Sequence, residues 1–255
     1  MNLNLNKQAV TSYRSLSQKV RVLTEGWVDS YIFCPSCGRD VKSYPHNKPV
    51  ADFYCPKCSE DFELKSKKDY FGKKIVDGAY RTMMERLQGD TNPNLFLLSY
   101  HLTKYKVTNF FVVPKHFFVP QIIEKRKPLS SAARRAGWTG CNILINSVPL
   151  SGRIFYIRDK KIESKKSVLG NWKKTLFLRE SRTDKLKGWI LDTMKCIDRL
   201  NKKEFSLQEM YGFEKDLKLK YPNNKHIKDK IRQQLQFLRN KGYLEFRGKG
   251  KYKLI

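Results

Sequence analysis

Short apolar runs separated by polar turns predict a sheet in the N-terminal part of the chain. The runs at 94–101, 109–114 and 153–158 are rich in Phe, Val, Leu and Ile and are bounded by Pro, Asn or Gly, which is typical of buried strands. Two shorter strands are predicted before them, at 49–54 and 61–66. These runs are too short to be helices of ordinary length, so a sheet is the better interpretation.

Two segments in the same part of the chain have the spacing of helices. One is predicted around residues 14–28. The other spans residues 73–88, where apolar side chains recur every four positions, at Ile75, Ala79, Met83 and Leu87. The expected fold is therefore α/β, with a mixed sheet flanked by helices.

The C-terminal part has a different pattern. Helices are predicted at 188–199, 206–220 and 224–240, and the second begins with a capping box formed by Ser206 and Glu209. The third has one apolar side, made of Ile227, Ile231, Leu235 and Leu238. Two basic strands joined by the turn Arg247-Gly248-Lys249-Gly250 follow. The pattern predicts a first domain over residues 1–182 and a small winged-helix domain over residues 183–255.

The charge of the chain points to a polyanionic partner. Its 255 residues include 52 Lys and Arg against 24 Asp and Glu, a formal net charge of +28. Such an excess attracts phosphate backbones, so nucleic acid is favoured over a membrane or an acidic protein; the alternative is a basic protein that is merely soluble. No segment has the length and apolar character of a membrane span or a signal peptide, which predicts a cytoplasmic protein.

Four of the six cysteines form two Cys-x-x-Cys pairs. Cys34 and Cys37 make the first pair, Cys55 and Cys58 the second. Two such turns can complete a tetrahedral four-cysteine site for structural Zn2+, and Pro and Gly beside them suit tight turns. A redox pair is the alternative, but one redox pair does not explain two. Cys141 and Cys196 are expected to be buried small residues.

Charged residues surround the second cysteine pair. Asp52 precedes it, and Glu63 and Lys65 follow it on one face of the strand predicted at 61–66. If the two strands form a hairpin, Asp52 and Glu63 can hold Mg2+, and Lys65 can orient a water or offset charge on a phosphate. The alternative is an ordinary solvated strand face, since two more lysines follow.

The arrangement of Asp52, then Glu63-Leu64-Lys65, resembles the motif of the PD-(D/E)XK nucleases, with Ala51 where many members have Pro. The cysteine pairs around it, together with "NKPVADFYC", "FELKSKK", "IVDGAY", "ARRAGWTGCNI" and "IRQQLQFLRNKGYLEFRGKGKYK", resemble the DpnI-like type II restriction endonucleases over nearly the whole chain. The resemblance implies a zinc-stapled PD-(D/E)XK domain followed by a winged helix, and cleavage of GATC when its adenine is methylated. Glu25 could be an additional acid beside the metal, or an ordinary surface residue.

Residues 125–142 combine five cations, no acid and an aromatic turn. Arg134 and Arg135 could meet phosphate or guanine, and Trp138 offers an apolar surface to a methyl group. From the sequence alone, Trp138 is more simply a core residue beneath a loop. The resemblance implies instead that this loop faces DNA, where an indole suits a site that favours methylated adenine.

The predicted helix at 224–240 and the turn after it carry a basic surface. Residues 225–255 hold ten Lys or Arg against two acids. The polar side of the helix carries residue types that contact phosphates and base edges in the major groove, and the turn adds a basic wing. A neutral protein-contact module is the alternative. The expected DNA-binding residues are Lys225, Lys228, Arg232 and Gln233 on the helix, and Arg247 and Lys249 on the wing.

Three functional classes follow from these patterns. The preferred one is a monomeric, Mg2+-dependent endonuclease whose catalytic domain and winged helix both recognise double-stranded DNA with adenine-methylated GATC. The second is a regulator that reads methylated DNA without cleaving it. The third, a zinc-ribbon RNA-binding protein, explains the cysteines and the charge but not the acids on adjacent strands or the wing.

Overall fold

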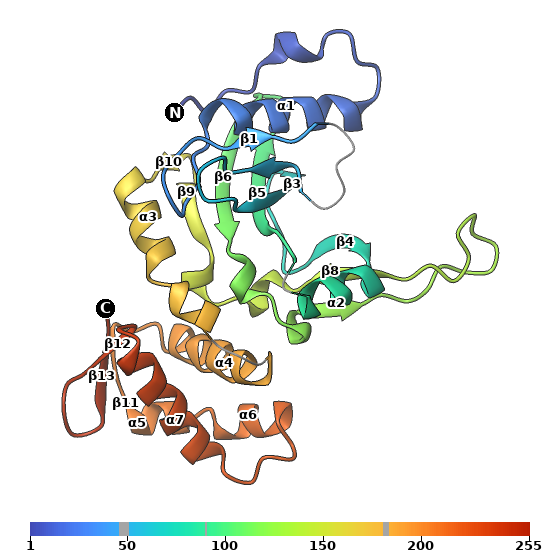
Figure 1. Cartoon of the computed structure of the whole chain (residues 1–255). Coiled ribbons are helices and arrows are strands. Elements are labelled where there is room, and N and C mark those ends of the chain that lie inside the picture. Colours follow the sequence, from blue (N-terminus) through green and yellow to red (C-terminus); the bar gives the residue numbers. More distant parts are fainter. Residues whose placement is uncertain (46–50, 90, 181–183) are drawn as a thin grey trace. The chain divides into compact units, whose positions relative to one another are not determined.

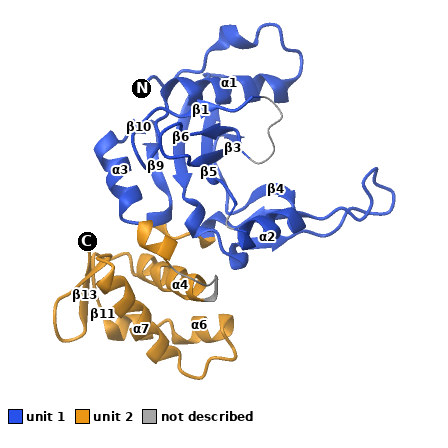
Figure 2. Ribbon diagram, viewed as in Figure 1, with its two compact units in different colours: residues 1–146, 151–175 blue, residues 147–150, 176–255 orange. Residues whose placement is uncertain are grey.

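The chain forms two compact units. The computed structural model describes residues 1–45, 51–89, 91–180 and 184–255. Unit 1 comprises Met1–Asn146 and Ser151–Thr175, and unit 2 comprises Ser147–Leu150 and Leu176–Ile255 (Figure 2). Each unit has its own buried apolar residues, so each is described separately.

Unit 1 is built around a seven-stranded mixed sheet (Figure 1). Strands β3 and β5 run parallel, and the other neighbouring pairs are antiparallel. Strand β5 lies near the middle of the sheet and is buried along almost its whole length, which explains its continuous apolar run. In sheet order the strands are β1 (Lys42–Ser43), β2 (Phe53–Tyr54), β3 (Asp61–Lys68), β5 (Asn94–His101), β6 (Lys106–Val113), β9 (Ile154–Arg158) and β10 (Lys161–Ile162).

Two helices of unit 1 pack against this sheet. Helix α1 (Leu16–Tyr31) buries Trp27, whose ring meets Phe110 of β6 edge-on at 5.5 Å. Helix α3 (Lys165–Lys173) lies beside β9 and buries Trp172. Helices flanking a mixed sheet confirm the predicted α/β class. Short 3-10 helices join the elements at Lys7–Val10, Lys115–Phe117, Pro120–Ile122, Ile145–Ser147, Leu150–Gly152 and Leu176–Glu180.

The prediction of one helix over residues 73–88 is wrong in its first half. Residues Ile75–Ala79 form strand β4, and helix α2 begins only at Tyr80 and ends at Gln88. Strand β4 pairs with β8 (Gly140–Ile143), which also pairs with β7 (Ile123–Lys125), giving a second, three-stranded sheet. The β-branched Ile75 and Val76 favour a strand, Gly78 disfavours a helix interior, and pairing with a distant partner outweighs the four-residue spacing.

The other predictions for unit 1 agree with the structure within a few residues at their ends. The helix predicted at 14–28 is α1, and the strand predicted at 61–66 is β3. The strand predicted at 49–54 is shorter: residues 49 and 50 lie outside the described part, and β2 covers Phe53–Tyr54.

Unit 2 contains four helices and a three-stranded sheet among its described residues. The sheet order is β11-β13-β12, and β11 was not predicted from the sequence. The capping box of Ser206 and Glu209 is confirmed, but the helix predicted after it is divided near Gly212. The elements are α4 (Asp184–Leu200), β11 (Glu204–Ser206), α5 (Leu207–Tyr211), α6 (Glu214–Lys220), α7 (Ile227–Asn240), β12 (Leu244–Phe246) and β13 (Lys251–Leu254).

Helix α7 has the apolar side that the sequence predicts. Ile227, Ile231, Leu235 and Leu238 are all buried. The strands after the helix form the expected hairpin, closed by a turn in which Gly248 has a φ of +83°. Left-handed backbone of this kind favours glycine, which explains the glycines of the basic turn. Helices followed by a hairpin of this kind form a winged helix-turn-helix unit.

Candidate active site and metal site

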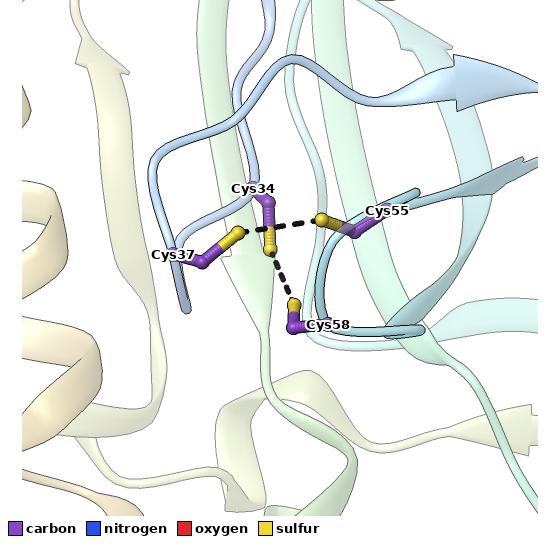
Figure 3. A group of neighbouring side chains, drawn as sticks. All are labelled: Cys34, Cys37, Cys55 and Cys58. Carbon is purple, nitrogen blue, oxygen red and sulfur yellow. Dashed lines mark hydrogen bonds between the residues drawn. The ribbon is translucent and has the colours of Figure 1, made fainter.

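The two Cys-x-x-Cys turns come together in unit 1 (Figure 3). Cys34 and Cys37 follow α1, and Cys55 and Cys58 lie in the turn between β2 and β3. The four Sγ atoms all lie within 4.8 Å of one another. The Sγ atoms of Cys34 and Cys58 are 3.5 Å apart, and those of Cys37 and Cys55 are 3.3 Å apart.

The two turns are built alike. In the first, the amide of Gly38 donates to the carbonyl of Cys34 at 2.8 Å; in the second, the amide of Ser59 donates to the carbonyl of Cys55 at 3.0 Å. Gly38 and Ser59 both have positive φ, 75° and 55°. Two matching turns therefore present their sulfur atoms to one point.

Four converging sulfur atoms suit a zinc ion. Burial raises the pKa of the Cys34 thiol, and a bound cation would favour the thiolate form that Zn2+ requires. The group could therefore hold zinc. Cys141 and Cys196 are buried elsewhere, as expected, and burial raises the pKa of their thiols to about 11 and about 12. Among the described residues, the metal-ligating group consists of the four cysteines of the two turns.

The hairpin of β2 and β3 positions the predicted acidic set. The amide of Asp52 donates to the carbonyl of Phe62 at 2.9 Å, and the Asp52 carboxylate accepts a bond from the amide of Leu64 at 2.7 Å. Phe62 is fully buried and stacks on Phe96 of β5 at 4.3 Å. Since side chains alternate along a strand, anchoring Phe62 directs Glu63 away from these buried rings.

Asp52, Glu63 and Lys65 line one pocket of about 280 Å3. The pocket also contains Asp77 of β4, which the sequence reasoning missed. The ammonium of Lys65 lies 2.5 Å from a carboxylate oxygen of Glu63 and 2.7 Å from one of Asp77. Asp77 was missed because its segment was predicted to be helical; the available signal was an acid directly after the β-branched pair Ile75-Val76.

The charges in this pocket influence one another. Burial raises the pKa of Glu63, which nearby Lys65 lowers and nearby Asp77 raises further. Burial alone would lower the pKa of Lys65, but the carboxylates of Glu63 and Asp77 outweigh it, so this pKa is raised. The lysine therefore remains an ammonium ion, and the carboxylates of Glu63 and Asp77 share it as their cation.

Glu25 lines a second cavity, of about 470 Å3, together with Asp29 and Asp52. Asp52 thus faces both cavities. Glu25 forms an ion pair with Arg21 at 2.8 Å, and its side chain is 24% exposed. Of the predicted acidic set, only Asp52 lines this cavity with Glu25, so a role for Glu25 beside a metal stays a prediction.

The segment that carries Trp138 is a long hairpin between β7 and β8 that projects from unit 1 (Figure 1). Arg134 and Arg135 are exposed, and Trp138 is half-buried. The Arg135 guanidinium lies 5.0 Å from the Trp138 ring, and a side chain on Gly140 would come within 2.9 Å of that ring. Trp138 is therefore a half-buried residue at the base of the loop, and its interpretation as a core residue is wrong.

The predicted DNA-binding residues of unit 2 are all exposed, on α7, before it and on the wing. Two of them already have acidic neighbours: Lys228 lies 3.5 Å from Glu214, and Arg247 lies 3.2 Å from Glu245. The others are Lys225, Arg232, Gln233 and Lys249. The apolar side of α7 is packed inside the unit, so its polar side is the one open to a partner.

A mixed α/β unit that carries a four-cysteine group, together with a winged helix-turn-helix unit, defines a two-domain α/β protein with an appended DNA-binding domain. The chain belongs to the Dam-replacing family: the family model, DpnI, matches residues 1–181. The model of the Dam-replacing HTH domain, DpnI_C, matches residues 185–254. This membership indicates a nuclease with a DNA-binding domain. Among the described residues, no helix is long and apolar enough to cross a membrane.

Proposed function

We propose that this protein is a methylation-dependent type II restriction endonuclease. It cleaves phosphodiester bonds of double-stranded DNA at GATC sites whose adenine is methylated. The observation that carries the proposal is the meeting of Asp52, Glu63 and Lys65 in one pocket on the β2–β3 hairpin. Membership of the Dam-replacing family and a net charge of +28 support the same substrate class.

The carboxylates of Asp52 and Glu63 are oxygen donors of the kind that Mg2+ prefers, so the donor set fits this ion. When bound, Mg2+ supplies a Lewis acid beside the scissile phosphate. The hydrogen bond from the Leu64 amide fixes Asp52 relative to Glu63. Lys65 remains charged, and its ammonium orients the attacking water or stabilises negative charge developing on the phosphate oxygens.

Both units contribute to recognition in this proposal. On unit 1, Arg134 and Arg135 contact phosphate or guanine, and Trp138 presents its ring to the adenine methyl group. On unit 2, α7 enters the major groove and the wing neutralises phosphates. Burying one methyl group contributes only about 0.8 kcal/mol. Strong discrimination against unmethylated DNA therefore needs contacts with methyl groups at more than one place on the protein. The proposed protein is a monomer with one structural Zn2+ in the four-cysteine site.

A plasmid cleavage assay tests the proposal. Plasmid DNA from adenine-methylating and non-methylating hosts is incubated with the protein and Mg2+, and only the methylated plasmid should be cut at GATC. Asp52→Asn keeps an oxygen that can accept the Leu64 amide, so this variant should bind methylated DNA and not cut it. Equal cutting of both plasmids would contradict methyl dependence. Binding without cutting by the wild type would favour the reader that lacks nuclease activity.

Zinc content and mass test the remaining parts. Elemental analysis should find one zinc per chain, and light scattering should find the mass of one chain in the absence of DNA. Preference for single-stranded RNA over methylated duplex DNA in competition would contradict the proposed substrate.

A further inference from the structure

Asp77 lies outside the motif that the sequence resembles, yet its carboxylate lies beside the proposed catalytic lysine. It belongs to β4 of the three-stranded sheet, whereas Lys65 belongs to β3 of the seven-stranded sheet. Its side chain is only 7% exposed, and it lines the same pocket as Asp52 and Glu63. The ion pair of 2.7 Å between Lys65 and Asp77 therefore bridges two sheets at the site.

We infer that Asp77 is a positioning residue that holds the Lys65 ammonium toward the scissile phosphate. The inference rests on the proposed nuclease function. Lys65 has a long, flexible stem, and an ammonium group needs fixed partners to remain in one place. Its two ionic partners among the described residues are Glu63 and Asp77.

The two partners are not equivalent. Glu63 is a proposed ligand of Mg2+, so its carboxylate cannot be devoted to the lysine during the reaction. Asp77 then becomes the partner that keeps the ammonium in place. An ammonium has three N–H donors, so contacts with two carboxylates leave one donor for water or a phosphate oxygen.

The backbone around Asp77 supports a dedicated position. The pairing of β4 with β8 shifts register between Asp77 and Ala79, which marks a bulge. Bulges redirect a side chain and are common beside active sites. The carbonyl of Gly78 within the bulge accepts a bond from the Cys141 thiol at 3.5 Å, and Asp77 itself is paired with Cys141. The bulge is thus held from the neighbouring strand.

The test compares Asp77→Asn with the wild type in single-turnover cleavage of a methylated GATC duplex. Enzyme is in excess over DNA, Mg2+ is varied up to a saturating concentration, and DNA affinity is measured separately with Ca2+ in place of Mg2+. Loss of the carboxylate should lower the cleavage rate constant by roughly 10- to 100-fold, the scale of a misplaced catalytic group. The amplitude of the reaction, the DNA affinity and the Mg2+ concentration for half-maximal rate should remain unchanged.

These readouts separate positioning from other roles. A purely structural role would lower the burst amplitude measured with DNA in excess, since fewer enzyme molecules are folded, but not the single-turnover rate constant. Recovery of the rate at higher Mg2+ would make Asp77 a metal ligand and overturn the inference, as would an unchanged rate constant. If Asp77→Asn does not fold, Asp77→Ser replaces it, with the assay run at low temperature.

Glu85→Gln is the matched control. Glu85 lies on α2, is 58% exposed and pairs with Arg81, so its replacement changes the net charge equally without touching the pocket. The control should cleave at the wild-type rate. If the wild type itself fails to cleave, the proposed function fails and the inference with it; if the wild type cleaves and Asp77→Asn matches it, only the inference fails.

Discussion

Replacing Lys65 with methionine separates the stability of the site from its chemistry. The ammonium of Lys65 lies 2.5 Å from Glu63 and 2.7 Å from Asp77, so its removal leaves two carboxylates facing each other without a cation. Methionine has a similar length and keeps the apolar packing of the lysine stem. The change therefore tests the charge itself.

The size of the effect follows from burial. The side chains of Lys65, Glu63 and Asp77 are 25%, 22% and 7% exposed. Removing one partner of a fully buried pair costs roughly 3–5 kcal/mol, and an exposed pair contributes about 0–1 kcal/mol. This partly exposed cluster should lose about 2–3 kcal/mol of unfolding free energy, or about 4–12 °C in Tm for a unit of this size.

The assay combines thermal unfolding with cleavage. Lys65→Met should lower the Tm of unit 1, keep DNA binding, and reduce the cleavage rate by roughly 100-fold or more, because the donor to the phosphate is lost. The double variant Lys65→Met/Asp77→Asn removes one of the unpaired carboxylates. It should regain at least about half of the lost stability and none of the activity.

Two results would refute this reasoning. If Lys65→Met is as stable as the wild type, the three charges do not form one energetic cluster. If the double variant regains cleavage together with stability, the lysine acts only by maintaining the fold. Glu85→Gln again supplies the control for a change of one charge at the surface.

Three further predictions concern other parts of the chain. Chelation of zinc, or Cys34→Ser, should unfold unit 1, whereas omission of Mg2+ should stop cleavage and leave Tm unchanged; equal Tm after verified zinc loss would contradict a structural role. Trp138→Ala should reduce the preference for methylated over unmethylated GATC by roughly 4-fold per methyl group, measured as a ratio of kcat/KM, with little change in Tm. Lys202, followed by the backbone and side chain of Ser206, lowers the pKa of Glu209 to about 2. Because this folded pKa lies below the ordinary value, the stabilisation by the ionised Glu209 is present above about pH 4.5 and is lost as pH falls toward 2. Glu209→Gln should therefore lower Tm at pH 7, and the Tm values of the variant and the wild type should converge near pH 2.

The sequence predicted those site residues that lie close to one another along the chain. Two Cys-x-x-Cys pairs imply a four-sulfur group because each turn presents two thiols locally, and the structure brings all four together. Likewise, alternation along residues 61–66 directed Glu63 and Lys65 to one face, and a turn of fixed length brought Asp52 opposite them.

The sequence did not predict residues that come together through pairing of strands far apart along the chain. Strand β4 was predicted to be helical because its spacing also fits a helix, and only pairing with β8 makes it a strand. The position of Asp77 beside Lys65 depends on that pairing and on the bulge within it. The sequence did not distinguish a core position for Trp138 from a position on a protruding hairpin, because a tryptophan suits both environments.

By itself, the sequence determined the α/β class, the cysteine group, the acidic set and the winged helix, since each follows from local periodicity or from residues close along the chain. Only the tertiary structure decided which other groups lie near the acidic set: Asp77, from a second sheet, shares its pocket, and Glu25 of α1 lies on the adjoining cavity. The physical reason is that pairing between strands far apart in sequence depends on the packing of the whole unit. A local pattern of residues does not specify which distant strand it pairs with.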